Sequence, residues 1–211
     1  MIILMKTIQR FIPAFFFLFS FNCTAQNFDI DLLKSINENK SAFKDDYSSV
    51  MSKSVTPITI AAPVSLFIAG WANHDKKLQK DAAYFAGGYI LSAIITTGTK
   101  HIVQRERPYN AYSFIEKRDV GGGYSFPSGH TSAAFYTATS LSILYPKWYV
   151  IVPSYLWASS VAWARMYQGV HYPTDVFAGA VVGAGSAWVG YKLKKWMDKK
   201  PAAKKSPTPS L

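Results

Sequence analysis

The chain has 211 residues, of which 49% are hydrophobic and 17% are charged, whereas a soluble domain carries about 25% charged residues. A single cysteine, Cys23, excludes an internal disulfide and a thiolate zinc site, and 16% aromatic residues argue against a disordered or fibrous chain. The formal net charge of +11 fits a nucleic acid, a membrane surface or an anionic substrate as partner, so the positions of the charges must decide.

Residues 1–25 have the pattern of a secretory signal peptide. Two basic residues precede a short apolar run over 11–21, and small residues follow it. The run is shorter than the ~20 apolar residues that a membrane span needs, which favours a signal peptide over an uncleaved first span. A lipid-modified Cys23 is a further alternative, disfavoured by Asn22 in front of it. Each alternative places residue 26 and its successors outside the cytoplasm.

Residues 26–54 predict an amphipathic pair of helices, lying at the membrane interface or packed on the rest of the protein. Apolar residues recur there at mostly helical spacing between charged ones such as Asp29 and Asp31. The residues on the predicted packed face are Ile30, Leu33, Ile36, Asn37, Phe43, Tyr47, Val50 and Met51.

Five apolar segments without Asp, Glu, Lys or Arg follow, and together they predict a membrane-embedded domain over 55–197. They cover residues 55–72, 82–99, 131–145, 148–164 and 176–191. Each is rich in Ala, Gly, Ser and Thr, which suits close packing of helices within a bundle. We therefore expect an all-α bundle of about five transmembrane helices. A soluble all-helical bundle is the alternative, because the segments are only moderately hydrophobic.

The charges of the loops favour the membrane protein. Lysines concentrate in the loops at 74–80 and 146–147 and after residue 191, which alternate with two other loops and are expected in the cytoplasm. Trp71, Trp148 and Trp196 stand at predicted helix ends, where interfacial aromatic residues belong. Residues 198–211 predict a disordered basic tail. The expected location is the bacterial inner membrane, with the two remaining loops facing the periplasm.

The two outward loops carry a set of residues suited to phosphoryl transfer. Lys100, Arg107 and Arg165 match the charge that spreads over the oxygens of a phosphoryl group in flight. The sequence Pro127-Ser128-Gly129-His130 opens a predicted helix, where unpaired backbone N–H groups attract anions. An ordinary helix start capped by Ser128 is the alternative interpretation.

His171 and Asp175 stand four residues apart at the start of the last predicted helix. The carboxylate can hold one ring nitrogen of His171 and leave the other unprotonated, as a nucleophile or base requires. His130 would then protonate the departing oxygen and later activate water. The alternative is a His–Asp pair that merely links helix ends.

Other loop residues receive no catalytic role. His74 and His101 lack a spaced partner and are expected to be ordinary surface residues. Arg105 and Arg118 are expected to be solvated charges. The glycines at 121–123 predict a flexible connection, and Tyr124 and Tyr167 are candidates for the substrate entrance.

Three spaced blocks resemble the motifs of the phosphatidic acid phosphatase type 2 superfamily, which shares its site with bacterial nonspecific acid phosphatases and vanadium haloperoxidases. The blocks are Lys100 with Arg107-Pro108, then Pro127 to His130, then Arg165 with His171 and Asp175. The chain departs from the pattern at Ala164, where the family usually has serine. This change removes a hydroxyl group but no charge and no nucleophile, so we expect at most a modest loss of activity.

The resemblance implies a helical bundle, a phosphohistidine intermediate on His171, Asp175 as its partner and His130 as acid and base. It also implies that phosphate is held by Lys100, Arg107, Ser128, Gly129 and Arg165, without a metal or other cofactor.

The expected function is a membrane phosphatase acting on a lipid phosphate or diphosphate, such as a polyprenyl diphosphate, phosphatidylglycerol phosphate, phosphatidic acid or lipid A, with no nucleic-acid partner. Three alternatives stay open. They are a soluble periplasmic acid phosphatase or phosphotransferase, a non-enzymatic membrane protein that binds anionic headgroups, and a haloperoxidase.

Overall fold

The computed structural model describes residues 22–199, and helices are the only regular elements in that range. They are α2 (Asn22–Glu38), α3 (Ala42–Ala72), α4 (Lys76–Val103), α5 (Pro108–Ala111), α6 (Gly129–Leu144), α7 (Trp148–Tyr167) and α8 (Pro173–Lys199). The prediction of an all-α protein is confirmed for this part of the chain. The predicted signal peptide lies outside the described residues except for its last four positions, and nearly all of the predicted basic tail does too.

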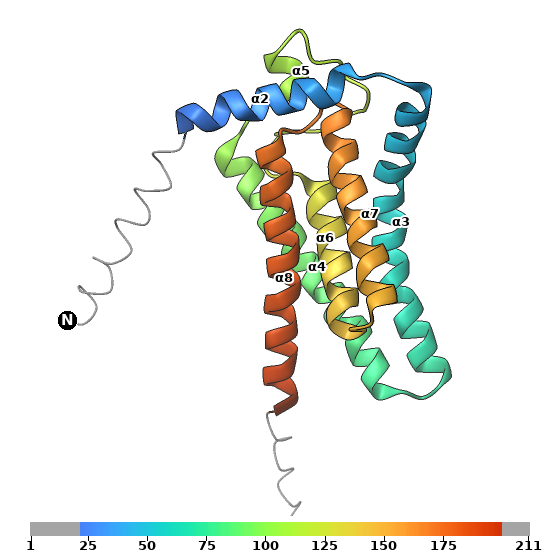
Figure 1. Ribbon diagram of the computed structural model, residues 1–211. Helices are drawn as coiled ribbons and strands as arrows, with labels where there is room; N and C mark the ends of the chain where they lie inside the picture. The colour runs from blue at the N-terminus through green and yellow to red at the C-terminus, as the bar shows by residue number, and fades with distance from the viewer. Residues whose placement is uncertain (1–21, 200–211) are drawn as a thin grey trace, which may run out of the picture.

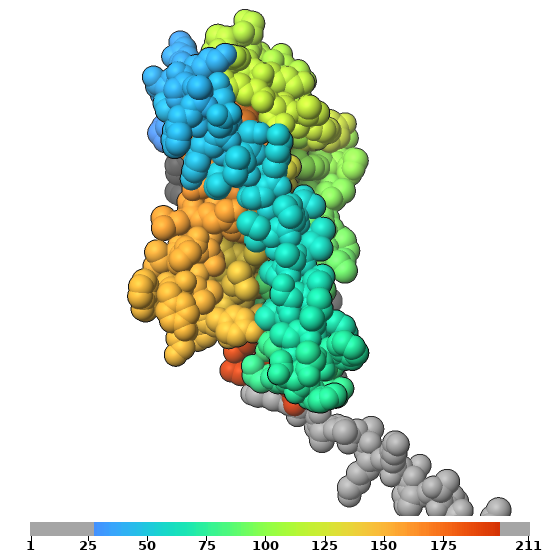
Figure 2. All heavy atoms as spheres, turned by 90° about the vertical axis from the view of Figure 1, so that its right-hand side faces the viewer, coloured from blue at the N-terminus to red at the C-terminus, as the bar shows by residue number. Residues whose placement is uncertain are grey.

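Five long helices run side by side along the molecule, and α2 lies across one end of them (Figure 1). Helix α6 is the centre of this bundle, because it packs against all four of the others: α3, α4, α7 and α8. The loop that contains α5 lies at the same end as α2, and the space-filling view shows the two segments next to each other there (Figure 2).

Small side chains allow α6 to occupy this central position. Seven of its residues are buried and have short side chains: Thr131, Ser132, Ala133, Ala134, Thr137, Ala138 and Ser140. On α8, Gly179 and Gly183 face α6 one turn apart. A Cβ atom on Gly179 would lie 2.6 Å from the Ser128 carbonyl oxygen, and one on Gly183 would overlap the Ser132 carbonyl oxygen. The expectation that small residues serve close helix packing is confirmed.

Several polar groups buried inside the bundle are hydrogen-bonded, whereas the hydroxyl groups of Ser140 and Ser186 have no partner among the described residues. The Ser132 hydroxyl lies 2.9 Å from that of Ser92 and accepts a bond of 3.1 Å from Thr96. Lower in the bundle, the Tyr136 hydroxyl donates to the carbonyl oxygen of Phe85 at 2.7 Å. Such pairing removes the free-energy penalty of burying hydroxyl groups away from water.

Helix α3 joins two segments that the sequence analysis separated. Its N-cap is Ser41, whose side chain accepts the N–H of Lys44 at 3.2 Å, and the helix runs without interruption through the predicted boundary at residue 54 to Ala72. Pro57 and Pro63 both lie inside it. By length and composition, α3 and α8 are the two described helices that qualify as membrane spans.

Helix α2 is packed on the bundle. Leu33 is fully buried, in a cluster with Ile115 and Tyr172 of the loops below it. Of the two placements that the sequence allowed for this segment, the structure shows packing on the rest of the protein, at the end of the bundle where the loop with α5 also lies (Figure 1).

Candidate active site

The structure brings the predicted site residues to the end of the bundle that α2 covers. Lys100 lies in the last turn of α4, Arg107 just before α5, and Arg165 in the last turn of α7. Ser128 is the N-cap of α6, with Gly129 and His130 in its first turn. His171 precedes α8, and Asp175 lies in the first turn of that helix.

His171 and Asp175 form a fully buried pair, with side chains 2% and 0% exposed. The Nδ1 atom of His171 lies 3.5 Å from Oδ2 of Asp175, and the Nε2 atom lies 3.4 Å from Nη1 of Arg107. The same Asp175 oxygen accepts the N–H of Tyr172 at 2.9 Å and the hydroxyl of Ser125. A carboxylate facing Nδ1 favours the tautomer protonated there and leaves the lone pair on Nε2.

The surroundings of His171 keep its ring neutral. Burial lowers the pKa of His171 to about 3, and although Asp175 favours the charged ring, the positive charges of Arg107 and Arg165 oppose it. A neutral imidazole carries the lone pair that a nucleophile needs.

Arg107 and Lys100 are wrapped by the loop that follows α5. The Arg107 guanidinium donates to the carbonyl oxygens of Gly123 at 3.0 Å, Gly122 at 2.7 Å and Val170 at 2.8 Å. Lys100 donates through Nζ to the carbonyl oxygen of Tyr124 at 2.6 Å.

The glycines of that loop lie close to Arg107. A Cβ atom at Gly121 would lie 2.8 Å from the Arg107 guanidinium, so a larger residue there would have to displace Arg107.

Arg165 has a carboxylate partner that the sequence analysis missed. Its side chain is 2% exposed, and Nη1 donates to Asp119 at 2.6 Å and to Gln168 at 2.8 Å. Burial lowers the pKa of Arg165, and the adjacent Asp119 opposes that shift. The only hint in the sequence was that Asp119 is an acidic residue in the same outward loop as Arg107 and Lys117.

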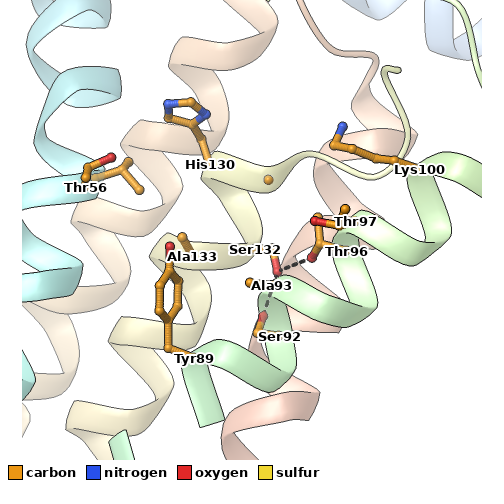
Figure 3. Close-up of a pocket in the computed structure, with 12 residues that line it drawn as sticks. Thr56, Tyr89, Ser92, Ala93, Thr96, Thr97, Lys100, His130, Ser132 and Ala133 are labelled. Atoms are coloured by element: carbon orange, nitrogen blue, oxygen red, sulfur yellow. Dashed lines mark hydrogen bonds between the residues drawn. The ribbon is translucent and has the colours of Figure 1, made fainter. Parts of the chain in front are cut away.

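His130 lies in a cavity of about 270 Å³ that begins beside Lys100 and runs between α3, α4 and α6 (Figure 3). Thr56 of α3 lines one side of it, and Tyr89 and Thr96 of α4 line the other. Burial lowers the pKa of His130 to about 4, and the positive charge of Arg165 adds to this effect. His130 and Lys100 therefore face the same space.

Ser128 acts as the helix cap that the sequence analysis considered as an alternative. Its Oγ atom accepts the N–H of Thr131 at 3.5 Å and the hydroxyl of Thr131 at 3.0 Å. Its own N–H donates to the carbonyl oxygen of Asp175 at 3.0 Å, which joins the start of α6 to the start of α8.

Two arginines expected to be solvated charges are instead built into the site region, so that expectation is wrong. Arg105 donates through Nη1 to Asp175 at 2.7 Å and through Nη2 to Asp29 at 2.8 Å. The Arg118 side chain is 8% exposed and donates to the carbonyl oxygen of Asn37 at 2.6 Å. Both partners in α2 are far away in sequence, which is why no local pattern indicated the contacts.

Of the remaining predictions for loop residues, the one for the two histidines is confirmed and the one for Tyr167 is wrong. His74 and His101 are exposed, as expected of surface residues. Tyr167 is fully buried and donates its hydroxyl to Asp45 at 2.7 Å, so it does not line an entrance. Tyr124 is half-buried, with its ring edge-on to His101.

Comparison with known proteins gives one family. A family model described as the PAP2 superfamily matches residues 81–198. A lipid A 4'-phosphatase of Bacteroides thetaiotaomicron is 36% identical over 86 residues, which are 41% of this chain and 38% of that protein. An undecaprenyl-diphosphatase of Sulfolobus acidocaldarius is 26% identical over 170 residues, which are 78% of this chain and 76% of that protein.

Two solved structures share the fold. Aquifex aeolicus LpxE superimposes with a TM-score of 0.69 at 24% identity, over 78% of this chain and 95% of its own. A transmembrane PAP2-type phosphatidylglycerolphosphate phosphatase from Bacillus subtilis superimposes with a TM-score of 0.70 at 19% identity, over 89% of this chain and 98% of its own.

Proposed function

Because this chain belongs to the PAP2 superfamily, we propose that it is a membrane phosphatase that hydrolyses a lipid phosphate or diphosphate through a phosphohistidine intermediate. The observation that carries this proposal is the buried His171, held by Asp175 on one ring nitrogen and facing Arg107 with the other. The reaction needs a nucleophile, positive charge around the phosphoryl oxygens and a proton donor for the leaving oxygen.

In the proposed mechanism, Nε2 of His171 attacks phosphorus while Asp175 stabilises the positive charge that develops on the ring. Lys100, Arg107 and Arg165 neutralise the phosphoryl oxygens, with N–H groups at the start of α6 by Ser128 and Gly129. His130 protonates the oxygen that leaves with the lipid. It then takes a proton from the water molecule that attacks the phosphohistidine, which releases phosphate and restores His171.

A membrane location is supported by the outer surface of the bundle. Large apolar side chains are exposed along four helices, among them Ile60, Val64, Phe67, Ile90, Ile94, Val152, Leu156, Phe177 and Val181. Exposed apolar surface of this extent calls for a lipid or protein partner, and we propose that α3, α4, α6, α7 and α8 all cross the bilayer. Helix α6 needs little apolar surface of its own, because the other four surround it.

The proposed orientation of the protein is supported by the residues at the two ends of the helices. Lysines gather at the start of α4 and the end of α8, whereas Lys100 and Asp175 lie at the opposite ends of the same two helices. By the positive-inside rule, this distribution supports a site on the periplasmic side. Exposed Trp71 and Trp148 lie at the lysine-rich end, as expected of residues at a membrane interface.

A lipid substrate is favoured by the cavity beside His130. Its walls include Val55 and Thr56 of α3 and Ala93 of α4, helices whose outer faces are apolar. A substrate chain lying in that space would reach the site from the bilayer. The similar proteins named as lipid A 4'-phosphatase and undecaprenyl-diphosphatase also point to lipid phosphates.

The function is tested with the purified protein in detergent and a phosphate-release assay. Undecaprenyl diphosphate, phosphatidylglycerol phosphate, phosphatidic acid and lipid A are compared with a water-soluble aryl phosphate. We expect a lipid to be the preferred substrate, activity to survive EDTA, and vanadate to inhibit, because cations and histidines supply the chemistry. Activity that EDTA abolishes and added metal restores would contradict the mechanism, and preference for the soluble ester would favour the acid phosphatase.

The pH dependence tests the role of Lys100, which lies one residue beyond the predicted span at 82–99. Burial and the neighbouring Arg107 lower the pKa of Lys100 to about 8. A lysine is charged below its pKa, so kcat/KM should fall as the pH rises through about 8 in the wild type. Lys100→Arg keeps its charge at that pH, and its profile should lack this alkaline fall. An identical alkaline limb in both proteins would show that Lys100 does not cause it.

A further inference from the structure

Helix α2 presents a buried polar face to the site. Asp29, Leu33 and Asn37 recur every four residues, so they lie on one side of the helix, and their exposures are 2%, 0% and 1%. Burying a carboxylate and an amide costs free energy unless both are hydrogen-bonded. The Asp29 carboxylate and the Asn37 amide both have such partners, in or next to the loops that carry the candidate catalytic residues.

Asn37 fixes one end of this face. Its Nδ2 atom donates to the carbonyl oxygens of Glu116 and Tyr167, each at 2.9 Å, and its Oδ1 atom accepts the N–H of Glu116 at 2.9 Å. These three bonds connect α2 with the loop after α5 and with the last residue of α7.

Asp29 fixes the other end at the start of α8. Its Oδ1 atom accepts the backbone N–H of Thr174 at 2.8 Å, and its Oδ2 atom accepts the Thr174 hydroxyl. The first N–H groups of a helix have no partner within that helix. Asp29 of α2 thus caps α8 at Thr174, which is the residue directly before Asp175.

Arg105 connects the two carboxylates. It donates from Nη2 to Asp29 at 2.8 Å and from Nη1 to Asp175 at 2.7 Å, and its guanidinium lies 3.7 Å from the centre of the Tyr172 ring. Asp175 binds Arg105 through Oδ1 and faces His171 through Oδ2. The orientation of the Asp175 carboxylate therefore depends on both neighbours.

We propose that Asp29 and Arg105 are positioning residues that hold Asp175, and through it His171, in the reactive orientation. The inference rests on the proposed function of His171 as nucleophile. Neither residue lines the cavity beside His130 and Lys100. The Arg105 side chain is 26% exposed and Asp29 is one of its two carboxylate partners, so without Asp29 the guanidinium is held less firmly against Asp175.

Asp29→Asn tests the proposal, because asparagine can still accept the Thr174 N–H but no longer attracts Arg105 by charge. The expected result is a kcat lower by about 10-fold or more with KM within about two-fold, the pattern of a misplaced catalytic group rather than of lost substrate binding. Asp31→Asn is the matched control, since Asp31 is exposed on the same helix and its loss should leave both constants unchanged. Arg105→Lys should resemble Asp29→Asn.

A second measurement separates positioning from a general loss of structure. If Asp29 acts through Asp175, then Asp29→Asn should add almost nothing to the defect of Asp175→Asn, whereas independent effects would multiply. Thermal unfolding of each variant in detergent accompanies the assays. Multiplying defects, or wild-type kcat in Asp29→Asn, would overturn the proposal.

A third measurement does not depend on phosphate release. In protein labelled with ¹⁵N-histidine, the ring nitrogens of His171 are assigned by their loss in His171→Ala. We expect one tautomer, protonated on Nδ1, in the wild type and in Asp31→Asn, and a mixture in Asp29→Asn. An unchanged His171 signal in Asp29→Asn would refute the positioning role even if the wild type released no phosphate, a result that would refute only the proposed function.

Discussion

The His171→Ala variant is expected to form no phosphoenzyme and to lose phosphate release by roughly 10³-fold or more, because no other side chain can replace the attacking nitrogen. The ring is buried, is held by Asp175 and has a pKa of about 3, so Nε2 carries its lone pair throughout the physiological range. The measurement is to mix the enzyme with a ³²P-labelled substrate, to quench the reaction with alkaline SDS, and to recover label on the protein that is stable to base and labile to acid.

His101→Ala is the matched control for this experiment, since His101 is an exposed histidine of the same outward region and should leave labelling unchanged. Asp175→Asn should form phosphoenzyme slowly, because the ring remains but its tautomer is no longer held. Normal phosphate release by His171→Ala would remove His171 from the role of nucleophile.

The His130→Ala variant is expected to lose about 10²-fold or more on an alkyl lipid phosphate and far less on an aryl phosphate, whose leaving group needs no proton. In the protein without phosphate, burial and the charge of Arg165 hold the pKa of His130 at about 4, so the ring is neutral. A bound phosphate brings negative charge into the same space. This charge offsets that of Lys100, Arg107 and Arg165 and raises the pKa, so His130 can carry the proton that the leaving oxygen requires.

The decisive comparison is the ratio of the two losses, measured as kcat/KM for each substrate in His130→Ala and in the wild type. Phosphohistidine should still form from the aryl ester in the variant. Equal losses on both substrates would mean that His130 does not act as the general acid. Failure of the variant to form phosphoenzyme from either substrate, together with labelling of His171→Ala, would reverse the two roles.

Much of the fold and of the site could be predicted from the sequence because the information is local. An uncharged apolar run such as 82–99 can only be a buried or membrane helix, and the four-residue spacing of His171 and Asp175 places both at one helix start. Because that run ends at residue 99, it also places Lys100 at a helix end. These patterns need no knowledge of distant parts of the chain.

The contacts that were missed are between segments far apart in sequence. Asp29 stands among Asp31 and other charged residues of α2, and nothing nearby distinguishes a buried carboxylate from a solvated one. Its burial arises only when α2 lies over the start of α8. Arg105 could not be separated from ordinary loop charges for the same reason, because both of its carboxylate partners come from other elements.

The two glycines of α8 that face α6 have a mechanical consequence. Gly179 brings the backbone of α8 against the Ser128 carbonyl group, immediately beside His130, while Asp175 lies one turn earlier on the same helix. Backbone contacts contain no rotatable side chain that could absorb a sliding motion of one helix along the other. The longitudinal register of α6 and α8 therefore sets the distance between the proton donor His130 and the nucleophile His171. Bulkier residues at these glycines would change that distance without altering either histidine.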